Sequence, residues 1–258
     1  MNENTKQANY RAIFFDLDGT LLPIHTDDFM RNYMAMLNQF IESHGVERDV
    51  FAFALRRGIT AMTEHEDKQS NAVAFWDEFM SLVPKSRAFW DEILGDFYEN
   101  RFNAIGSMVH PNPCAAEAVG LLQAKAYPLV LTTMPMFPLS AVEWRLDWSG
   151  LARNVFSRIT HYENSTSVKP KLAYYEENLR AGGLEPGDVL LVGNNTKDDL
   201  VCMELGMDAY LITDYLINPN GFDLSLVKHG SFPDFVAWAG GLAKCTNPAT
   251  SFATGLIT

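Results

Sequence analysis

Two aspartates that can carry out acid, base or nucleophilic chemistry stand close together near the start of the chain. Asp16 and Asp18 are separated by one residue and directly follow a short apolar run, Ala12 to Phe15. Alternate side chains of an extended segment point to the same side, so both carboxylates would face one region. A first carboxylate there can attack phosphorus, and a second can protonate the departing oxygen and later deprotonate water. The same residues also fit an acidic turn in which Asp18 and Gly19 make the bend.

Thr132 and Lys169 are two further candidates for phosphate chemistry. Thr132 ends the apolar run Leu129 to Leu131, and its hydroxyl can hydrogen-bond a phosphoryl oxygen. Lys169 is followed by Pro170, and its ammonium can neutralise phosphate charge. Taken singly, the threonine is more simply a hydroxyl at a strand end and the Lys-Pro pair a solvated helix entry, so their meaning depends on the other motifs.

Amide and carboxyl side chains follow a third apolar run, Val189 to Val192. Asn194 comes two residues after this run, and Asp198 and Asp199 follow four and five residues later. Their oxygens are suitable ligands for Mg²⁺, which prefers octahedral oxygen coordination and keeps some of its water. The residues by themselves leave open which of the two aspartates would bind the metal.

The strands that must position these side chains are recognisable as short apolar runs, at 12–15, 128–131, 188–192 and 209–212. Segments of helical character lie between these runs, at 115–126, 171–180 and 198–205. Strands that alternate with helices are typical of a parallel α/β sheet, whose functional sites lie beyond the carboxyl ends of the strands. We therefore expect the candidate residues to gather at one edge of the sheet.

Residues from about 24 to 107 contain no strand-like run and have helical periodicity instead. Helices are predicted at 27–44, 49–65, 71–82 and 87–102. In the first of them apolar residues recur every three to four positions from Phe29 to Ile41, and Gly45 is a plausible stop. This pattern indicates an all-helical insertion after the first strand.

In their order along the chain, these motifs resemble those of the haloacid dehalogenase superfamily. The family's first motif, a hydrophobic strand followed by DxDGT, corresponds to Phe14 to Thr20. The second, an apolar strand ending in threonine or serine, corresponds to Leu129 to Thr132. The third, a lysine often followed by proline, corresponds to Lys169 and Pro170, and the fourth corresponds to Val189 to Asp199.

The resemblance implies an α/β fold of two parts. A Rossmann-like parallel-sheet core is expected from residues 1–22 and 108–258. The long gap between the first two motifs matches family members with a helical cap inserted there, so residues 23–107 are expected to form an all-helical cap domain. Such a cap would close over the site, exclude water and select the substrate.

The resemblance also implies which residues carry out the reaction. Asp16 is then the nucleophile that forms an aspartyl-phosphate, and Asp18 is the acid and base. Thr132 hydrogen-bonds the phosphoryl group, and Lys169 stabilises both the nucleophile and the phosphate. The implied function is a Mg²⁺-dependent phosphatase, and the expected partner is a small phosphorylated metabolite.

The implied Mg²⁺ ligands are Asp16, the main-chain carbonyl of Asp18, Asn194 and one later carboxylate. The family acid is usually followed by an aliphatic residue, and Leu200 follows Asp199, so we favour Asp199 and keep Asp198 as the alternative. Asn194 departs from the family, which usually has aspartate here. An amide oxygen can bind Mg²⁺ but adds no charge, so weaker metal binding is expected.

Other activities within the superfamily differ in what they require. Dehalogenases lack the second acid because halide leaves without a proton, so Asp18 favours a phosphatase. A phosphomutase that uses the same aspartyl-phosphate chemistry stays open. So does a catalytically weak relative that binds a phosphorylated metabolite or a partner protein, because Asn194 reduces the charge available to a metal.

Composition restricts the partners and the compartment. The 258 residues include 20 Lys and Arg against 32 Asp and Glu, a formal net charge of −12. Such a surface repels polyanions, so nucleic acid is not expected as a partner. Three cysteines without a CxxC pair and a polar N-terminus without a signal-peptide core predict a cytoplasmic protein that is not attached to a membrane.

The C-terminal region is expected to contain one last helix, at 232–242. The tail beyond it is rich in threonine, alanine and serine, and we expect it to be loosely held. The sequence does not indicate an oligomeric state.

Overall fold

The structure is a computed structural model that describes residues 9–66 and 68–257. The polar segment 1–8, for which we expect no signal peptide, lies outside the described residues. Within those residues, no helix combines the length and the apolar composition needed to cross a membrane.

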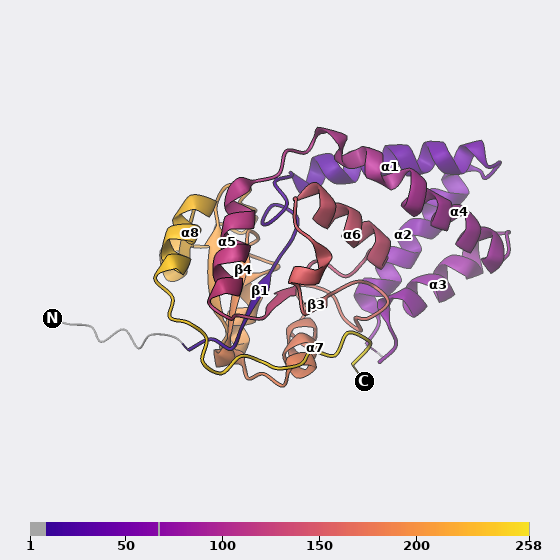
Figure 1. Cartoon of the computed structure of the whole chain (residues 1–258). Coiled ribbons are helices and arrows are strands. Elements are labelled where there is room, and N and C mark those ends of the chain that lie inside the picture. Colours follow the sequence, from indigo (N-terminus) through magenta and orange to yellow (C-terminus); the bar gives the residue numbers. More distant parts are fainter. Residues whose placement is uncertain (1–8, 67, 258) are drawn as a thin grey trace.

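A six-stranded parallel sheet lies at the centre of the fold (Figure 1). Its strands are β1 (Ala12–Phe15), β2 (Leu129–Leu131), β3 (Arg158–Ile159), β4 (Val189–Gly193), β5 (Asp208–Ile212) and β6 (Lys228–Gly230). They are arranged in the order β3-β2-β1-β4-β5-β6, and every neighbouring pair is parallel. Phe15 of β1 is in register with Leu131 of β2 and Val192 of β4, so these three strands end close together.

The four strands predicted from apolar runs are confirmed, and β3 and β6 are additions. The added strands are two and three residues long and include Arg158, Lys228 and His229. Neither has an apolar run that would mark it in the sequence. Their pairing is supplied by the neighbouring strands β2 and β5.

Helices cover both faces of the sheet because alternate strand residues point in opposite directions. Ile13 and Phe15 pack into one apolar core, and Ala12 and Phe14 pack into another. The first core is completed by α5 (Pro113–Ala124), α6 (Leu139–Trp148) and α8 (Phe232–Gly240). The second is completed by α7 (Leu172–Gly182) and the 3₁₀ helix η4 (Leu200–Leu205). The predicted helix at 198–205 is thus shorter than expected and of the 3₁₀ type.

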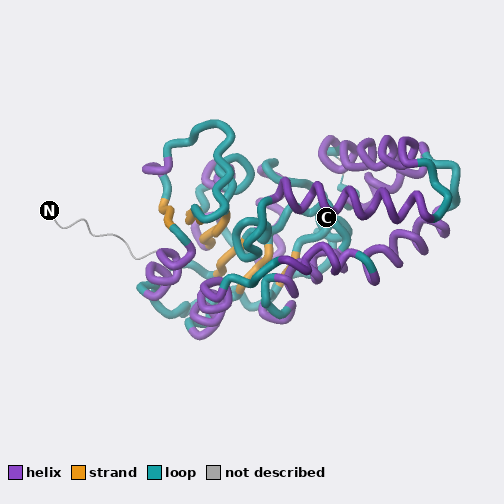
Figure 2. Tube along the Cα trace, turned by 90° about the horizontal axis from the view of Figure 1, so that it is seen from above, coloured by secondary structure: helices purple, strands orange, loops and turns teal. Residues whose placement is uncertain are grey.

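The insertion after β1 consists of α1 (Thr26–Ser43), α2 (Arg48–Glu64), α3 (Asn71–Leu82), α4 (Arg87–Asn100) and the 3₁₀ helix η1 (Phe102–Met108). No strand occurs among its described residues, 24–66 and 68–107. Seen from two directions, these helices extend from one side of the sheet (Figures 1 and 2). Short 3₁₀ helices complete the chain: η2 (Arg153–Val155), η3 (Pro186–Asp188) and η5 (Leu224–Leu226).

The helix α6 is not among the helices predicted from the sequence. Pro135 and Pro138 precede it, and they make the segment after β2 look broken. Pro138 is in fact the residue at which the helix is capped, with an extended backbone that leads into the first turn. A proline at a helix start costs no intrahelical hydrogen bond, because the first amides have no partner there.

The C-terminal tail is bound to the core, so the expectation that it is loosely held is wrong. The buried guanidinium of Arg158 donates to the main-chain carbonyls of Ala253 and Gly255, the latter at 3.0 Å. The amide of Ala253 donates to the carbonyl of Ala181 at 2.9 Å. Composition could not show this, because the tail is held by a side chain about a hundred residues away in the sequence.

Candidate active site

The candidate residues lie at the carboxyl ends of three adjacent strands. Asp16 follows β1, Thr132 follows β2 and Asn194 follows β4. Lys169 is contributed by the loop that precedes α7. This is the edge of a parallel sheet at which ligand sites form, because connecting loops from neighbouring strands converge there.

Lys169 joins two of the predicted carboxylates. Its Nζ donates to Oδ1 of Asp16 at 2.7 Å and to Oδ1 of Asp199 at 2.6 Å. The second oxygen of Asp199 accepts the main-chain amides of Asn194 at 3.0 Å and Asn195 at 2.9 Å. A Cβ on Gly193 would lie 2.3 Å from that carboxylate, so a side chain at this position would displace Asp199.

A hydroxyl from the same loop links Asp16 to Asn194. Thr20 Oγ1 is 3.3 Å from Oδ2 of Asp16 and 3.3 Å from Oδ1 of Asn194. The Nδ2 group of Asn194 donates to the carbonyl of Tyr215 at 2.6 Å, which fixes the amide with its oxygen toward Asp16. Gly19 has φ +79°, and a Cβ there would lie 2.2 Å from Asn194 Nδ2, so both the turn and the close approach require glycine.

The group formed by Asp16, Asp199 and Lys169 has two carboxyls for one ammonium. Burial raises the pKa of Asp16 to about 7; Lys169 opposes this shift and the charge of Asp199 adds to it. Burial disfavours the charged form of Lys169, but the two carboxylates outweigh it and hold the pKa of Lys169 well above its ordinary value. The arrangement would therefore be stabilised by one more positive charge.

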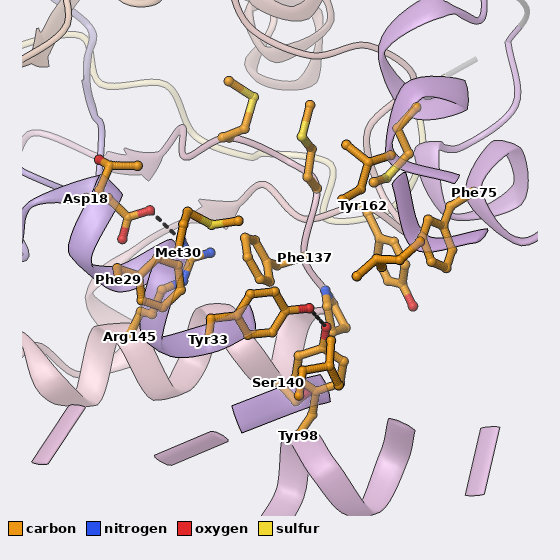
Figure 3. Close-up of a pocket in the computed structure, with 18 of the residues that line it drawn as sticks. Asp18, Phe29, Met30, Tyr33, Phe75, Tyr98, Phe137, Ser140, Arg145 and Tyr162 are labelled. Atoms are coloured by element: carbon orange, nitrogen blue, oxygen red, sulfur yellow. Dashed lines mark hydrogen bonds and ion pairs between the residues drawn. The ribbon is translucent and has the colours of Figure 1, made fainter. Parts of the chain in front are cut away.

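Asp18 is paired with a buried arginine that the sequence analysis did not single out. Nη1 of Arg145, on α6, donates to Oδ2 of Asp18 at 2.5 Å (Figure 3). The side chain is 1% exposed and lies over the rings of Phe137 and Phe29, at 4.7 and 5.7 Å from their centroids. Among described residues, Arg145 Nη2 and Asp18 Oδ1 have no hydrogen-bond partner.

The burial of Arg145 could be predicted from the sequence, but only if α6 is recognised as a helix. Arg145 lies on the buried side of this helix with Ala141, Val142 and Leu146. A charged residue at helical spacing among apolar ones is buried only when it is paired, so the pattern predicts a partner. It does not name the partner, which is 127 residues earlier in the chain.

Thr132 and Asp198 are placed differently from the other candidates. The Thr132 hydroxyl is buried and donates to the carbonyl of Phe15 at 3.2 Å, and Thr132 is not among the described residues that line the site cavity. Asp198 does line the cavity, and one of its oxygens accepts from Asn195 Nδ2 at 2.8 Å. Burial raises the pKa of Asp198, and the neighbouring charge of Asp199 raises it further.

The family model of haloacid dehalogenase-like hydrolases matches residues 10–201, which is more than half of the chain. The chain belongs to this family. No curated protein matches it.

Three solved structures illustrate the fold of this haloacid dehalogenase-like hydrolase. The HAD phosphatase from Thermococcus onnurineus is 18% identical, with a TM-score of 0.53 over 91% of this chain and 99% of the other. CbbY from Rhodobacter sphaeroides in complex with phosphate is 18% identical, with a TM-score of 0.56 over 88% and 96%. The L-2-haloacid dehalogenase PA0810 is 15% identical, with a TM-score of 0.53 over 89% and 99%. Phosphatases and dehalogenases share this fold, so the fold does not decide the reaction.

A cavity of about 410 Å³ lies in front of the carboxylates of this hydrolase. The predicted site residues that line it are Asp16, Asp18, Lys169, Asn194, Asp198 and Asp199. The remaining wall comes from α1 to α4, α6 and the loops after β2, β3, β4 and β5. The cavity therefore lies between the sheet edge and the helical insertion.

The Mg²⁺ that the family resemblance implies can be compared with the oxygen atoms present. Among the described residues, no group of three or more His, Cys, Asp or Glu side chains is arranged to hold a metal ion. The available donors are instead mixed: Asp16 Oδ2 and Asn194 Oδ1 face the same hydroxyl, and Asp198 lines the same cavity. Few carboxylates and room for water suit Mg²⁺, which keeps part of its hydration, and the missing positive charge fits a cation.

Proposed function

We propose that this hydrolase is a Mg²⁺-dependent phosphatase that cleaves a small phosphomonoester through an aspartyl-phosphate. The observation that carries the proposal is a second carboxylate, Asp18, on the wall of the cavity that contains Asp16. An alkoxide leaving group needs a proton and a halide does not, so this residue favours ester hydrolysis over dehalogenation. CbbY, which shares the fold, binds phosphate, and this agrees with the proposal.

The reaction would proceed in two displacements. An oxygen of Asp16 bonds to phosphorus while the ester P–O bond breaks, and Asp18 gives its proton to the departing oxygen. Water then attacks phosphorus, Asp18 takes up a proton from it, and the bond between phosphorus and Asp16 breaks to release phosphate. Arg145 occupies Oδ2 of Asp18, so the proton would be carried by Oδ1.

The other site residues would hold charge in place. Lys169 neutralises the nucleophile and the phosphoryl oxygens, and Asp199 positions Lys169. Thr132 is expected to hydrogen-bond the phosphoryl group. Its hydroxyl would first have to break its hydrogen bond to the carbonyl of Phe15. When bound, Mg²⁺ would neutralise negative charge on the phosphoryl group.

The proposed Mg²⁺ ligands are Asp16, the main-chain carbonyl of Asp18, Asn194 and Asp198. The aliphatic Leu200 after Asp199 favours Asp199 instead of Asp198. In the structure, however, both oxygens of Asp199 already accept hydrogen bonds from Lys169 and two amides. The Asp198 carboxylate accepts one hydrogen bond, from Asn195, and is partly exposed in the cavity, so we propose it as the metal-binding carboxylate.

The proposed location is the cytoplasm, and the proposed partner is a small phosphorylated metabolite. All three cysteines, Cys114, Cys202 and Cys245, are free thiols, which supports a reducing compartment. The net charge of −12 argues against nucleic acid as a partner.

A second candidate function is binding of a phosphorylated metabolite with little or no turnover. Two observations favour it: Asn194 contributes no charge to a metal, and Arg145 already holds Asp18. A phosphomutase differs only in passing the phosphoryl group from Asp16 to a second substrate. A panel of phosphorylated metabolites, assayed with Mg²⁺ and with Mn²⁺ for phosphate release and for isomerised product, distinguishes the three.

The nucleophile is tested by Asp16→Asn. We expect loss of p-nitrophenyl phosphate hydrolysis by on the order of a thousandfold or more, because an amide cannot form the aspartyl-phosphate. The thermal unfolding temperature should not fall, because the change removes one of two buried carboxyls that share Lys169. Asp147→Asn, at an exposed position of α6, is the matched control and should keep wild-type activity. Wild-type turnover by Asp16→Asn would show that another group attacks phosphorus.

A further inference from the structure

The site cavity continues from the catalytic carboxylates into the interior of the helical insertion. Its distant wall is formed by apolar side chains of α1, α2 and α4: Leu37, Phe51, Leu55, Ile59, Met62 and Leu94. Nearer to Asp18, the rings of Phe29 and Phe137 and the side chain of Met30 line it (Figure 3). The space that would surround the leaving group is therefore apolar.

Two of the hydroxyls that face this space are used within the protein. Tyr33 and Tyr98 hydrogen-bond to each other through their hydroxyls at 2.8 Å (Figure 3). Burial raises the pKa of Tyr33 to about 12, so this hydroxyl stays neutral. A sugar or polyol in this space would lose its hydrogen bonds to water and gain only apolar contacts, which disfavours binding.

The charges on the cavity wall also argue against a second anionic group on the substrate. Among the described lining residues the cations are Lys169 and Arg145, and both are paired with carboxylates at the phosphoryl end. Glu99 and Asp91 of α4 also line the cavity and are exposed, and Asp91 is paired with Arg87 at 2.7 Å, so the carboxylate of Glu99 is the main negative charge on this part of the wall. A second phosphate or a carboxylate would meet like charge there.

We propose that the substrate is the phosphomonoester of an apolar alcohol, aliphatic or aromatic, whose hydrocarbon part occupies the space between α1, α2, α3 and α4. This inference rests on the proposed phosphatase function for the reaction, but the binding preference follows from the cavity alone. At about 30 Å³ for a group the size of a water molecule, a cavity of about 410 Å³ holds on the order of a dozen methylene-sized groups. With part of this volume taken up by the phosphate, the cavity would hold alkyl chains of roughly eight to ten carbons.

A series of alkyl phosphates tests the preference. With Mg²⁺ present, kcat/KM should rise about fourfold for each methylene added from ethyl to octyl phosphate, as expected for burial of apolar surface. It should then level off when the cavity is full. Glycerol phosphate and glucose 6-phosphate should be poorer substrates than butyl phosphate.

Gly95 provides a variant that fills the cavity without disturbing the site. It lines the cavity on α4, and no described heavy atom outside its neighbours lies within 4 Å of a Cβ built there. Gly95→Leu should reduce kcat/KM for octyl phosphate at least tenfold and leave ethyl phosphate nearly unchanged. Gly120→Leu, on the exposed side of α5 with similarly open surroundings, is the matched control and should not alter the chain-length dependence.

Binding of alkylphosphonates separates this inference from the proposed function, because phosphonates have no ester bond to cleave. Calorimetry should give affinities that rise with chain length in the wild type and not in Gly95→Leu. If chain-length-dependent binding is found without hydrolysis of any ester, the apolar site stands and the phosphatase proposal fails. If sugar phosphates are hydrolysed best, or if neither affinity nor kcat/KM depends on chain length, the apolar site is refuted.

Discussion

Asn194 places an uncharged oxygen beside Asp16, at a point where a carboxylate would add a negative charge. Asn194→Asp should therefore lower the Mg²⁺ concentration needed for half-maximal activity, by about threefold to tenfold, because Mg²⁺ affinity depends on ligand charge. Titration of Mg²⁺ against phosphatase activity measures this. An unchanged requirement would mean that Asn194 does not bind the metal.

The same substitution has a consequence that does not depend on activity. Asn194 Nδ2 donates to the carbonyl of Tyr215, and an aspartate oxygen in its place would repel that carbonyl. The variant should be less stable than wild type without Mg²⁺ and should gain more stability when Mg²⁺ is added, since a ligand that binds the folded state stabilises it. Thermal unfolding with and without Mg²⁺ reports both effects.

Asp198 and Asp199 can be separated by the same titration. Asp198→Asn should raise the Mg²⁺ requirement, because it removes the carboxylate that we propose as a ligand. Asp199→Asn should mainly lower kcat, because the carboxylate that positions Lys169 is lost. A larger shift of the Mg²⁺ requirement in Asp199→Asn would support the choice made from the sequence instead.

At the scale of the elements, the wall of the cavity depends on how closely α2 and α3 approach. A Cβ on Gly58 of α2 would lie 2.6 Å from Cδ2 of Phe75 on α3 and 3.2 Å from its carbonyl oxygen. Phe75 also lines the cavity, so this contact sets the position of a ring that faces the cavity. Glycine at position 58 is required by the packing between the two helices.

Two helical glycines therefore respond differently to alanine. Gly58→Ala should destabilise the protein by about 1–3 kcal/mol, because the added methyl overpacks the contact between the helices. Gly120→Ala, with open space around it on α5, should instead stabilise by about 0.5–1 kcal/mol through helix propensity. Urea unfolding of both variants measures the difference. Equal stabilisation by the two changes would contradict the close approach of α2 and α3.

At the scale of the whole molecule, the C-terminal tail packs on the side of the sheet that α7 covers and is hydrogen-bonded to Arg158 of β3. Besides the bonds from Arg158, the Nδ2 group of Asn164 donates to the carbonyl of Thr254 at 3.0 Å. The ring of Phe252 packs on Gly182 at the end of α7, where a Cβ would lie 2.4 Å from it. The tail thus contributes to the core on the side of α7.

Removal of the tail should be costly for this reason. A chain that ends after Asn247 leaves the buried Arg158 without two carbonyl acceptors, and hydrogen bonds to charged groups contribute about 1.5–3 kcal/mol each. We expect a loss of stability on the order of 3 kcal/mol, measured by urea unfolding. A chain that ends after Leu256 keeps both acceptors and should match the full chain. If both truncations are equally stable, the tail does not hold Arg158 in solution.

The sequence by itself determined the strands β1, β2, β4 and β5, the helical insertion and the order of the motifs. These features are local, because an apolar run or a helical periodicity can be recognised within about ten to twenty neighbouring residues. Asp16 follows β1 and Asn194 follows β4 in the sequence itself, independently of long-range contacts. Parallel strands bring such positions to one edge of the sheet. This is why the predicted residues could be found before their contacts were known.

The tertiary structure decided which side chains meet. Arg145 reaches Asp18 across 127 residues, and Lys169 reaches Asp16 across 153. Asp199 is bound to Lys169 and Thr132 is turned toward Phe15, neither of which follows from spacing. The apolar interior of the insertion opens toward the carboxylates because helices of the insertion and loops at the sheet edge line the same cavity. Such contacts depend on burial and complementary charge between distant segments, so they cannot be predicted from local periodicity.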